Sequence, residues 1–383
     1  MNNLRKKLKN ISFIERLSSV KIMVVCLAWL FVLTFWGTVA QVNQGLYLAQ
    51  NKFFYSWFFI TLGFIPLPGA QLTLWIMFIN LVCSAIVHFQ YKWSQLGILI
   101  IHLGLLSYFA AAFVVFHSTV ESNLTLLEGE GSNVSSSYHD WELSVWPQSE
   151  DSTRDVSAFD AKHFKSDLKL DFKELGFSLA IKKYFPNAEA YNTVVEDQKE
   201  TFVNDSGIKQ LTAVSINKEP EKNLPGGIFE VQTADGQTIS LLLYGGETEP
   251  TQIKIGDQDV HFTLRRKRYI LPFTLTLQDF MMERHPGTEI ARSYQSKVVM
   301  QHNGISRDVL IFMNNPLRYK DFTLYQSSYF IDNFGREHST LAVVKNAGRF
   351  LPYIASFITF AGLVAHFLVM AIFKKVNRKL KND

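Results

Sequence analysis

The chain has 383 residues, 48% of them hydrophobic, and a formal net charge of +4. This length is enough for a membrane module together with a soluble one. Both cysteines, Cys26 and Cys83, lie in apolar segments. The long polar part of the chain therefore has no disulfides and no thiol redox chemistry of its own.

Four segments are long and apolar enough to span a membrane, since a helix needs about 20 apolar residues to cross a hydrocarbon core about 30 Å thick. The predicted transmembrane helices are 20–40, 72–89, 96–116 and 352–373. A signal peptide is the alternative for the first segment. Its apolar run is too long for that, and no small-residue cleavage site follows Gln41.

Basic residues are concentrated in two tails, 1–19 and 374–383. They are Arg5, Lys6, Lys7, Lys9, Arg16, Lys374, Lys375, Arg378, Lys379 and Lys381. Positive charge near span ends favours the cytoplasm, and an even number of spans places both termini on one side. We therefore predict cytoplasmic tails and an extracytoplasmic segment 117–348. A basic tail could instead bind nucleic acid, but both clusters adjoin apolar segments, which favours a juxtamembrane position and no nucleic-acid partner.

The outer link 43–69 is rich in aromatic residues, which precede its Pro66 and Pro68. Such density is typical of a membrane interface. We interpret the link as a short helix on the outer leaflet or against a partner. A half-buried loop is the alternative.

Segment 117–348 contains many short apolar runs separated by turn signals, a pattern typical of strands. Asp235-Gly236 and Asn303-Gly304 are hairpin dipeptides. We expect one short helix at 278–285 and an irregular entry segment at 117–160. The predicted fold class is thus four transmembrane α-helices plus a large, mostly-β extracytoplasmic domain between the third and fourth helices. This domain is a sandwich or an open barrel.

Three histidines lie in the predicted spans: His102 in the third, His366 in the fourth and His88 near the inner end of the second. Ionisable residues within spans are costly and are candidates for function, and neutral imidazole is a common axial ligand of haem iron. From the predicted span ends, His102 and His366 lie at equal depth, about 10 Å from the inner boundary. They could face each other across a flat cofactor, or each could bond a hydroxyl or a carbonyl. His88 is close enough to the interface to be solvated.

The outer segment has no HExxH, CxxC, GxSxG or P-loop motif, and no catalytic side chains are identified. The run 265–268 is densely basic. Arg265 and Arg266 could contact haem propionates or lipid phosphates. The alternative is a charged edge strand that resists aggregation.

Several short motifs occur in an order and spacing similar to those of a known family. They are Gly37-Thr38-Val39-Ala40-Gln41, His102-Leu103-Gly104-Leu105-Leu106, Leu127-Glu128-Gly129-Glu130, RKRYILPFTLTLQDF at 266–280, Pro286-Gly287-Thr288, Tyr294-Gln295-Ser296, Met313-Asn314-Asn315-Pro316-Leu317, Tyr325-Gln326-Ser327-Ser328-Tyr329 and Asn346-Ala347-Gly348. In this respect the chain resembles the ResB-like (CcsB-type) proteins of System II cytochrome c biogenesis. It departs from the family's Gly-Thr-x-x-Pro-Gln pattern at Ala40, which replaces the proline.

The resemblance implies a subunit of a haem lyase or cytochrome c synthase in the bacterial inner membrane, with a periplasmic domain. Such proteins work with a CcsA/ResC-type partner that carries a Trp-rich WWD motif. Together they move haem b across the membrane and attach it to an apocytochrome c whose thiols a separate thioredoxin-like protein reduces. By the same resemblance His102 becomes a haem axial ligand, and His366 a weaker candidate. The alternative is a membrane-anchored extracytoplasmic receptor or scaffold without haem.

Overall fold

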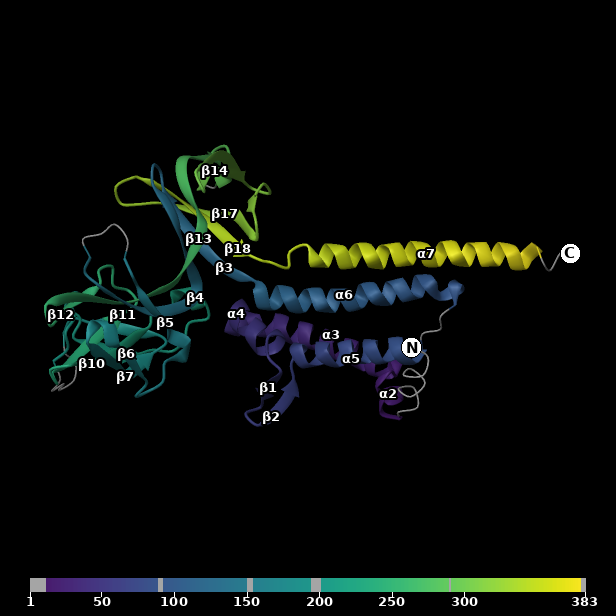
Figure 1. The fold of residues 1–383 in the computed structure, drawn as a ribbon, viewed down its shortest axis with the longest axis horizontal. Coiled ribbons are helices and arrows are strands. Elements are labelled where there is room, and N and C mark those ends of the chain that lie inside the picture. Colours follow the sequence, from purple (N-terminus) through teal and green to yellow (C-terminus); the bar gives the residue numbers. More distant parts are fainter. Residues whose placement is uncertain (1–11, 89–91, 150–153, 194–200, 289–290, 380–383) are drawn as a thin grey trace. The chain divides into compact units, whose positions relative to one another are not determined.

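A computed structural model describes residues 12–88, 92–149, 154–193, 201–288 and 291–379 (Figure 1). Parts of the predicted basic tails and of the inner link at 90–95 lie outside these residues. The chain divides into two compact units. The helical unit comprises Met1–Val120 and Lys345–Asp383, and the β-rich unit comprises Glu121–Val344.

The four predicted transmembrane helices are confirmed by four helices long and apolar enough to cross a membrane. They are α3 (Val20–Gln44), α5 (Ala70–His88), α6 (Leu96–Ser118) and α7 (Leu351–Lys379). In α6 and α7 only 11% of the most apolar 18-residue window is buried within the protein. A helix that is apolar on nearly all sides and so little covered by protein is suited to lipid contact.

A buried asparagine joins the short helix α2 (Ser12–Leu17) to α5. Asn80 of α5 is 3% exposed. Its amide donates to the carbonyl of Leu17 and, at 2.9 Å, to that of Ser19, where the chain breaks between α2 and α3. A broken helix leaves backbone carbonyls without hydrogen-bond donors. Where water is excluded, a polar side chain can donate to these carbonyls instead. Asn80 is therefore explained by the helix break.

Helices α6 and α7 pack through glycines. A Cβ atom added at Gly104 would lie 2.7 Å from the backbone nitrogen of Thr359, and one at Gly362 would lie 2.6 Å from that of Ile101. A Cβ at Gly97 would overlap the backbone of His366. Small residues at a helix interface permit this close approach of backbones. The pairs fix an antiparallel register, with the two helices side by side in Figure 1.

The aromatic link 43–69 is more regular than predicted. It forms α4 (Leu46–Ala49), a π-helical turn (Gln50–Phe54) and a hairpin of β1 (Phe58–Thr61) and β2 (Ile65–Pro68). Phe53 and Phe59 are buried, with ring centroids 4.9 Å apart, and both rings contact Trp36 of α3. Part of the aromatic density therefore forms a small core against α3.

The first lobe of the β-rich unit, here called the sandwich lobe, packs a four-stranded sheet in the order β11-β10-β7-β6 against β4, β5, β12 and the first half of β13. The bounds are β4 (Gly131–Pro147), β5 (Ser157–Asp160), β6 (Lys169–Phe172), β7 (Phe177–Phe185), β10 (Gly226–Thr233), β11 (Thr238–Tyr244), β12 (Thr251–Ile255) and β13 (Gln258–Arg284). Phe177 of β7 meets Phe262 of β13 across the core, with centroids 5.7 Å apart. Fully burying such side chains contributes about 1.5–3 kcal/mol each.

The second lobe, here called the curled lobe, is built from β3 (Val120–Leu127), the second half of β13, β14 (Ala291–His302), β15 (Ile305–Phe312), β16 (Leu317–Tyr319), β17 (Phe322–Ile331) and β18 (Glu337–Lys345). The sheet curls over its own core, because the Tyr294 hydroxyl of β14 donates to the Ser327 carbonyl of β17 at 3.0 Å, and Ser296 bonds Gln326 at 2.7 Å. The remaining short elements are β8 (Ala188–Tyr191), β9 (Gln210–Ala213) and the 3₁₀ turns Trp93–Gln95, Ala161–His163, Lys173–Leu175 and Pro220–Lys222.

Strand β13 runs through both lobes (Figure 1). In the sandwich lobe its buried residues are even-numbered, at 260, 262 and 264. In the curled lobe they are odd-numbered at 271, 273, 275 and 277, until an irregularity after Leu277 makes Phe280 the next buried residue. A shift of one residue turns the inward face of a strand outward. Pairing with β4 is irregular between Arg266 and Arg268 and again after Ile270. The basic run 265–268 therefore lies where the strand changes lobes.

Two local expectations are wrong and two are confirmed. Residues 278–284 belong to β13, and residues 279–284 pair with β14, so no helix forms there; strand pairing overrides the local pattern. Segment 117–160 contains β3, β4 and β5 and is not irregular. The dipeptides Asp235-Gly236 and Asn303-Gly304 do connect paired strands, with positive φ at Gly236 and at both Asn303 and Gly304.

The glycine contact predicts that a larger side chain on α6 destabilises the protein at the α7 interface but not at an exposed position. Gly104→Leu should lower the free energy of unfolding by about 1–3 kcal/mol, because the side chain would overpack against the Thr359 backbone. Ala110→Leu, on an exposed position of the same helix, is the matched control and should have little effect. Titration of the purified protein with a denaturing detergent measures both. Equal losses for the two variants would contradict the packing argument.

Candidate functional site

One ring nitrogen of His102 is bonded to the backbone of its own helix, and the other is left as a lone-pair donor. Its Nδ1 lies 2.8 Å from the Ile98 carbonyl one turn earlier in α6. A carbonyl only accepts, so Nδ1 carries the proton and Nε2 keeps its lone pair. Metal-binding histidines commonly donate their second ring nitrogen in this way. The residue is partly exposed.

The face of α6 that carries His102 is the face directed to α5. At roughly 100° per residue, His102 is turned roughly 140–160° away from Gly97 and Gly104, which contact α7. Phe109 and Phe113, seven and eleven residues later, share its face. Their rings pack on Phe78 and Trp75 of α5, each at 5.8 Å.

His366 lies elsewhere. Its backbone sits against Gly97, whereas the neighbour of His102, Ile101, sits against Gly362. Four residues separate the two levels on α7, or about 6 Å along the axis. Together with the different helix faces, this offset means that His102 and His366 do not face each other across a flat cofactor. The span ends predicted that His102 and His366 lie at equal depth, whereas the structure offsets them along the helix axis. The difference arises because glycine contacts, and not the lengths of the spans, align the two helices.

The ring nitrogens of His366 and His88 differ in their surroundings. His366 Nδ1 is buried and has no hydrogen-bond partner in the described part of the chain. His88 is exposed, as expected near an interface, and its Nε2 lies 3.1 Å from the hydroxyl of Ser18. That hydroxyl donates to the Glu15 carbonyl at 2.8 Å, so His88 is the donor to Ser18.

Arg265 is occupied by protein contacts. Its Nε donates to Glu142 Oε1 at 3.0 Å, and its guanidinium lies over the Trp146 ring, 5.8 Å from the centroid. The Glu142 side chain is only 5% exposed and also accepts from Ser144 at 3.1 Å. A buried carboxylate needs such partners because it is costly to take a charge out of water. Arg265 thus neutralises Glu142 within the fold.

Arg266 is also engaged. Its guanidinium stacks on Trp141, 4.2 Å from the ring centroid, and donates to the carbonyls of Tyr138 and Glu221. Burial lowers the pKa of the Arg266 guanidinium, and the carboxylates of Glu221 and Asp140 oppose that shift. No β4 residue between Ser136 and Trp141 pairs with β13, so β4 bulges there. The contacts of Arg266 stabilise this bulge.

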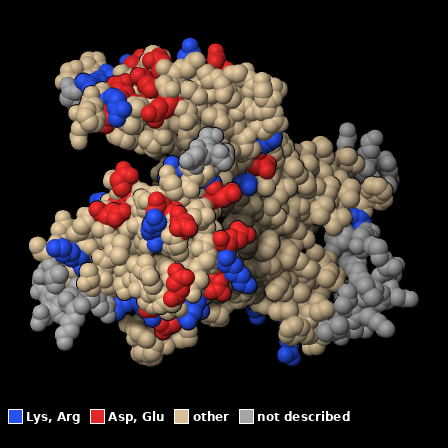
Figure 2. All heavy atoms as spheres, turned by 60° about the vertical axis from the view of Figure 1, so that its left-hand side comes forward, with Lys and Arg blue, Asp and Glu red and all other residues tan. Residues whose placement is uncertain are grey.

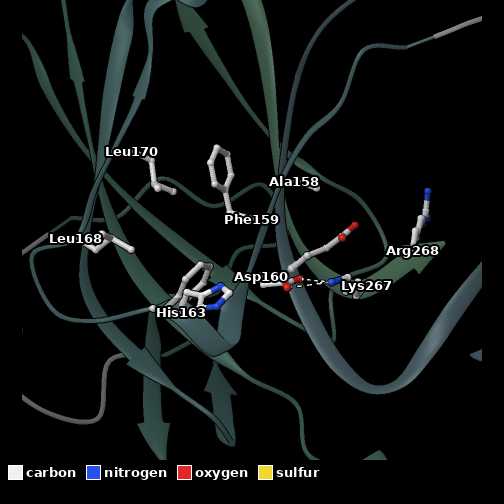
Figure 3. Close-up of a pocket in the computed structure, with 10 residues that line it drawn as sticks. Ala158, Phe159, Asp160, His163, Leu168, Leu170, Lys267 and Arg268 are labelled. Atoms are coloured by element: carbon white, nitrogen blue, oxygen red, sulfur yellow. Dashed lines mark hydrogen bonds and ion pairs between the residues drawn. The ribbon is translucent and has the colours of Figure 1, made fainter. Parts of the chain in front are cut away.

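The β-rich unit also contains a cavity of about 450 Å³ that sequence reasoning did not single out (Figure 3). One wall is apolar and the other carries charged side chains. The lining residues are Glu142, Ala158, Phe159, Asp160, His163, Phe164, Leu168, Leu170, Lys267 and Arg268. They come from four separate strands and a turn, so no local motif could indicate them. Lys267 and Arg268 belong to the basic run, which was the one sequence signal near this site.

Charges of both signs are mixed on the face of the β-rich unit that Figure 2 shows. Within the described ranges, no group of three or more His, Cys, Asp or Glu side chains is arranged to hold a metal ion.

The ResB-like family model matches residues 241–346, which run from the end of β11 through β18. Residues 241–346 are ResB-like. This match confirms the resemblance inferred from the motifs over residues 241–346. The ResB-like segment contains Arg265 and Arg266, whereas His102 and His366 lie outside it.

The chain is also similar to a curated protein. Protein NrfI of Wolinella succinogenes (strain ATCC 29543) is 31% identical over 100 residues, which is 26% of this chain and 11% of that protein. The chain thus matches only about a tenth of the relative's length.

The buried ion pair gives a stability prediction. Glu142→Ala should destabilise the β-rich unit by about 3 kcal/mol, because it leaves Arg265 without its partner. In a double-mutant cycle, Arg265→Ala should lower the free energy of unfolding less when Glu142→Ala is already present than it does in the native protein. Glu219→Ala, which breaks the surface pair with Lys222 at 62% exposure of both side chains, is the control and should cost less than about 1 kcal/mol. Urea unfolding followed by tryptophan fluorescence measures these effects, and additive losses would contradict the pairing.

His139 predicts a pH dependence. Burial, only partly offset by Glu221, lowers the pKa of His139 below its ordinary value of 6.5. The unfolded chain then binds more protons than the folded chain below about pH 6.5, so stability falls as the pH drops through that value. His139→Gln should reduce the difference in urea midpoint between pH 7.5 and 5.5. An unchanged difference would show that other groups carry the dependence.

Proposed function

We propose that this chain is a membrane subunit of a cytochrome c synthase. With a CcsA/ResC-type partner it carries haem across the bacterial inner membrane and supports its attachment to apocytochrome c. The ResB-like segment supports a role in cytochrome c biogenesis. The chain has four membrane-spanning helices and a β-rich unit between α6 and α7. This arrangement is consistent with a membrane complex that acts on one substrate in the lipid and another in the aqueous phase.

In this proposal His102 is the residue that binds the haem iron. The observation that carries it is the hydrogen bond from Nδ1 to Ile98, which leaves Nε2 as a lone-pair donor within a membrane-spanning helix. An ionisable residue at this depth is costly unless it has a partner or a function. The second ligand then comes from the CcsA/ResC-type partner, because His366 lies on another face and level of the helix pair.

The attachment chemistry requires alignment more than a side-chain nucleophile. Two thiols of the apocytochrome add across two vinyl groups of haem, and holding reduced reactants in line supplies much of the rate. The two cysteines of this chain, Cys26 and Cys83, are buried in α3 and α5. A separate thioredoxin-like protein therefore keeps the apocytochrome thiols reduced, and the WWD motif of the partner holds haem on the outer side.

The proposed orientation rests on charge. Basic tails at both ends support cytoplasmic termini and a periplasmic β-rich unit. Arg265 and Arg266 have protein partners already, so in this proposal they shape the β-rich unit and leave the propionates of haem b to other cations.

The test is an absorption spectrum of the complex purified with its CcsA/ResC-type partner. The native complex should show a bis-histidine haem spectrum. His102→Ala should lose at least about 90% of the membrane-haem signal, because one axial ligand is removed, and added imidazole should restore part of it. Retention of the signal in this variant would exclude His102 as ligand.

His117→Ala is the matched control. His117 donates from Nδ1 to Phe113 at 2.9 Å in the same helix, but near its other end. This variant should keep the haem signal and the yield of mature cytochrome c. His366→Ala should also keep the signal. A loss equal to that of His102→Ala would instead assign His366 as an axial ligand.

A further inference from the structure

The cavity of the sandwich lobe has two chemically different walls. Phe159 of β5 and Leu168 and Leu170 of the adjoining loop and β6 form an apolar wall, and their side chains are directed toward the same space in Figure 3. The opposite wall carries Asp160 and Lys267, with Arg268 at its edge. A volume of about 450 Å³ is in the range of small-molecule sites, which combine an apolar lining with a few polar groups.

The negative charges of this cavity are already neutralised. Asp160 accepts from Lys267 at 2.7 Å and from Lys162 at 3.1 Å. Glu142 is paired with Arg265 at 3.0 Å. Each carboxylate therefore has a cation, and Asp160 has two.

Positive charge remains in excess. Arg268 lines the cavity, and its side chain has no ion pair or hydrogen bond to any described residue. The cavity itself is lined by Lys267, Arg268, Asp160 and Glu142. Lys162 and Arg265, which do not line it, add two further cations as partners of these carboxylates. A free guanidinium beside an apolar wall suits a ligand that ends in a carboxylate, since arginine donates to carboxylates in a two-pronged geometry.

We propose that this cavity binds a small amphipathic carboxylate. The apolar body of the ligand lies against Phe159, Leu168 and Leu170, and its carboxylate accepts hydrogen bonds from Arg268. His163, exposed and at the lower edge of the cavity in Figure 3, adds a second donor. This site is in the β-rich unit and is separate from His102, so it stands or falls independently of the haem proposal.

Two sources share this ligand chemistry: a fatty carboxylate and the propionate side of haem. The experiment uses the full chain in phospholipid nanodiscs and measures amide hydrogen exchange of residues 157–172. The probes are decanoate, its uncharged methyl ester and haemin. Decanoate, haemin or both should slow exchange in this segment, and methyl decanoate should not. The probe that protects identifies the source.

Arg268→Gln should raise the half-saturating concentration of the protecting probe about tenfold, as expected for a lost charge-assisted hydrogen bond. Arg307→Gln, on an exposed residue of β15, is the matched control and should leave it unchanged. Ala158→Phe, which fills the cavity and keeps every charge, should also abolish protection.

Three results would overturn the proposal. They are no protection by either carboxylate probe, equal protection by the methyl ester, and unaltered half-saturation in both Arg268→Gln and Ala158→Phe. Exchange of β10 and β11 without probe reports whether each variant is folded. If Arg268→Gln perturbs these strands, Ala158→Phe alone decides the outcome.

Discussion

The contact between α6 and α7 determines where His102 and His366 lie. Three glycines, Gly97, Gly104 and Gly362, bring the two backbones close enough that any added Cβ would collide. Because the contact is made by backbone atoms, it has little freedom to slide. It sets the register of the pair, directs His102 away from α7 and toward the α5 side, and places His366 at a different level. In the haem proposal, the second axial ligand therefore comes from outside this pair.

A second constraint acts in the β-rich unit. Strand β13 contributes to both cores and must exchange its inward and outward faces between Leu264 and Leu271. The transition is made at irregular pairing, where side chains of both faces reach water. This position explains why four basic residues stand together there. Two of them, Arg265 and Arg266, stabilise β4 through Glu142, Tyr138 and stacked tryptophans. The other two, Lys267 and Arg268, face the cavity.

The two units connect through neighbouring elements. Strand β3 follows α6, strand β18 precedes α7, and these strands are adjacent in the sheet, with Thr125 and Thr340 hydroxyls 3.1 Å apart. The strands that enter and leave the β-rich unit thus stand side by side, as do the helices that precede and follow them. The haem proposal for His102 and the carboxylate proposal for the cavity concern different units, and each has its own test.

The sequence by itself determined the features that depend on local composition. Apolar runs of about 20 residues form the helices α3, α5, α6 and α7, because unpaired backbone N–H and C=O groups find no hydrogen-bond partners in lipid. Asn303-Gly304 gives a hairpin because both residues accept positive φ. The helix expected at 278–285 failed because pairing with β14, made by residues distant in sequence, outweighs local preference. The partners of Arg265, the offset between His102 and His366, and the cavity arise only when distant segments meet. Tertiary packing alone decides them, because each depends on which backbone lies opposite.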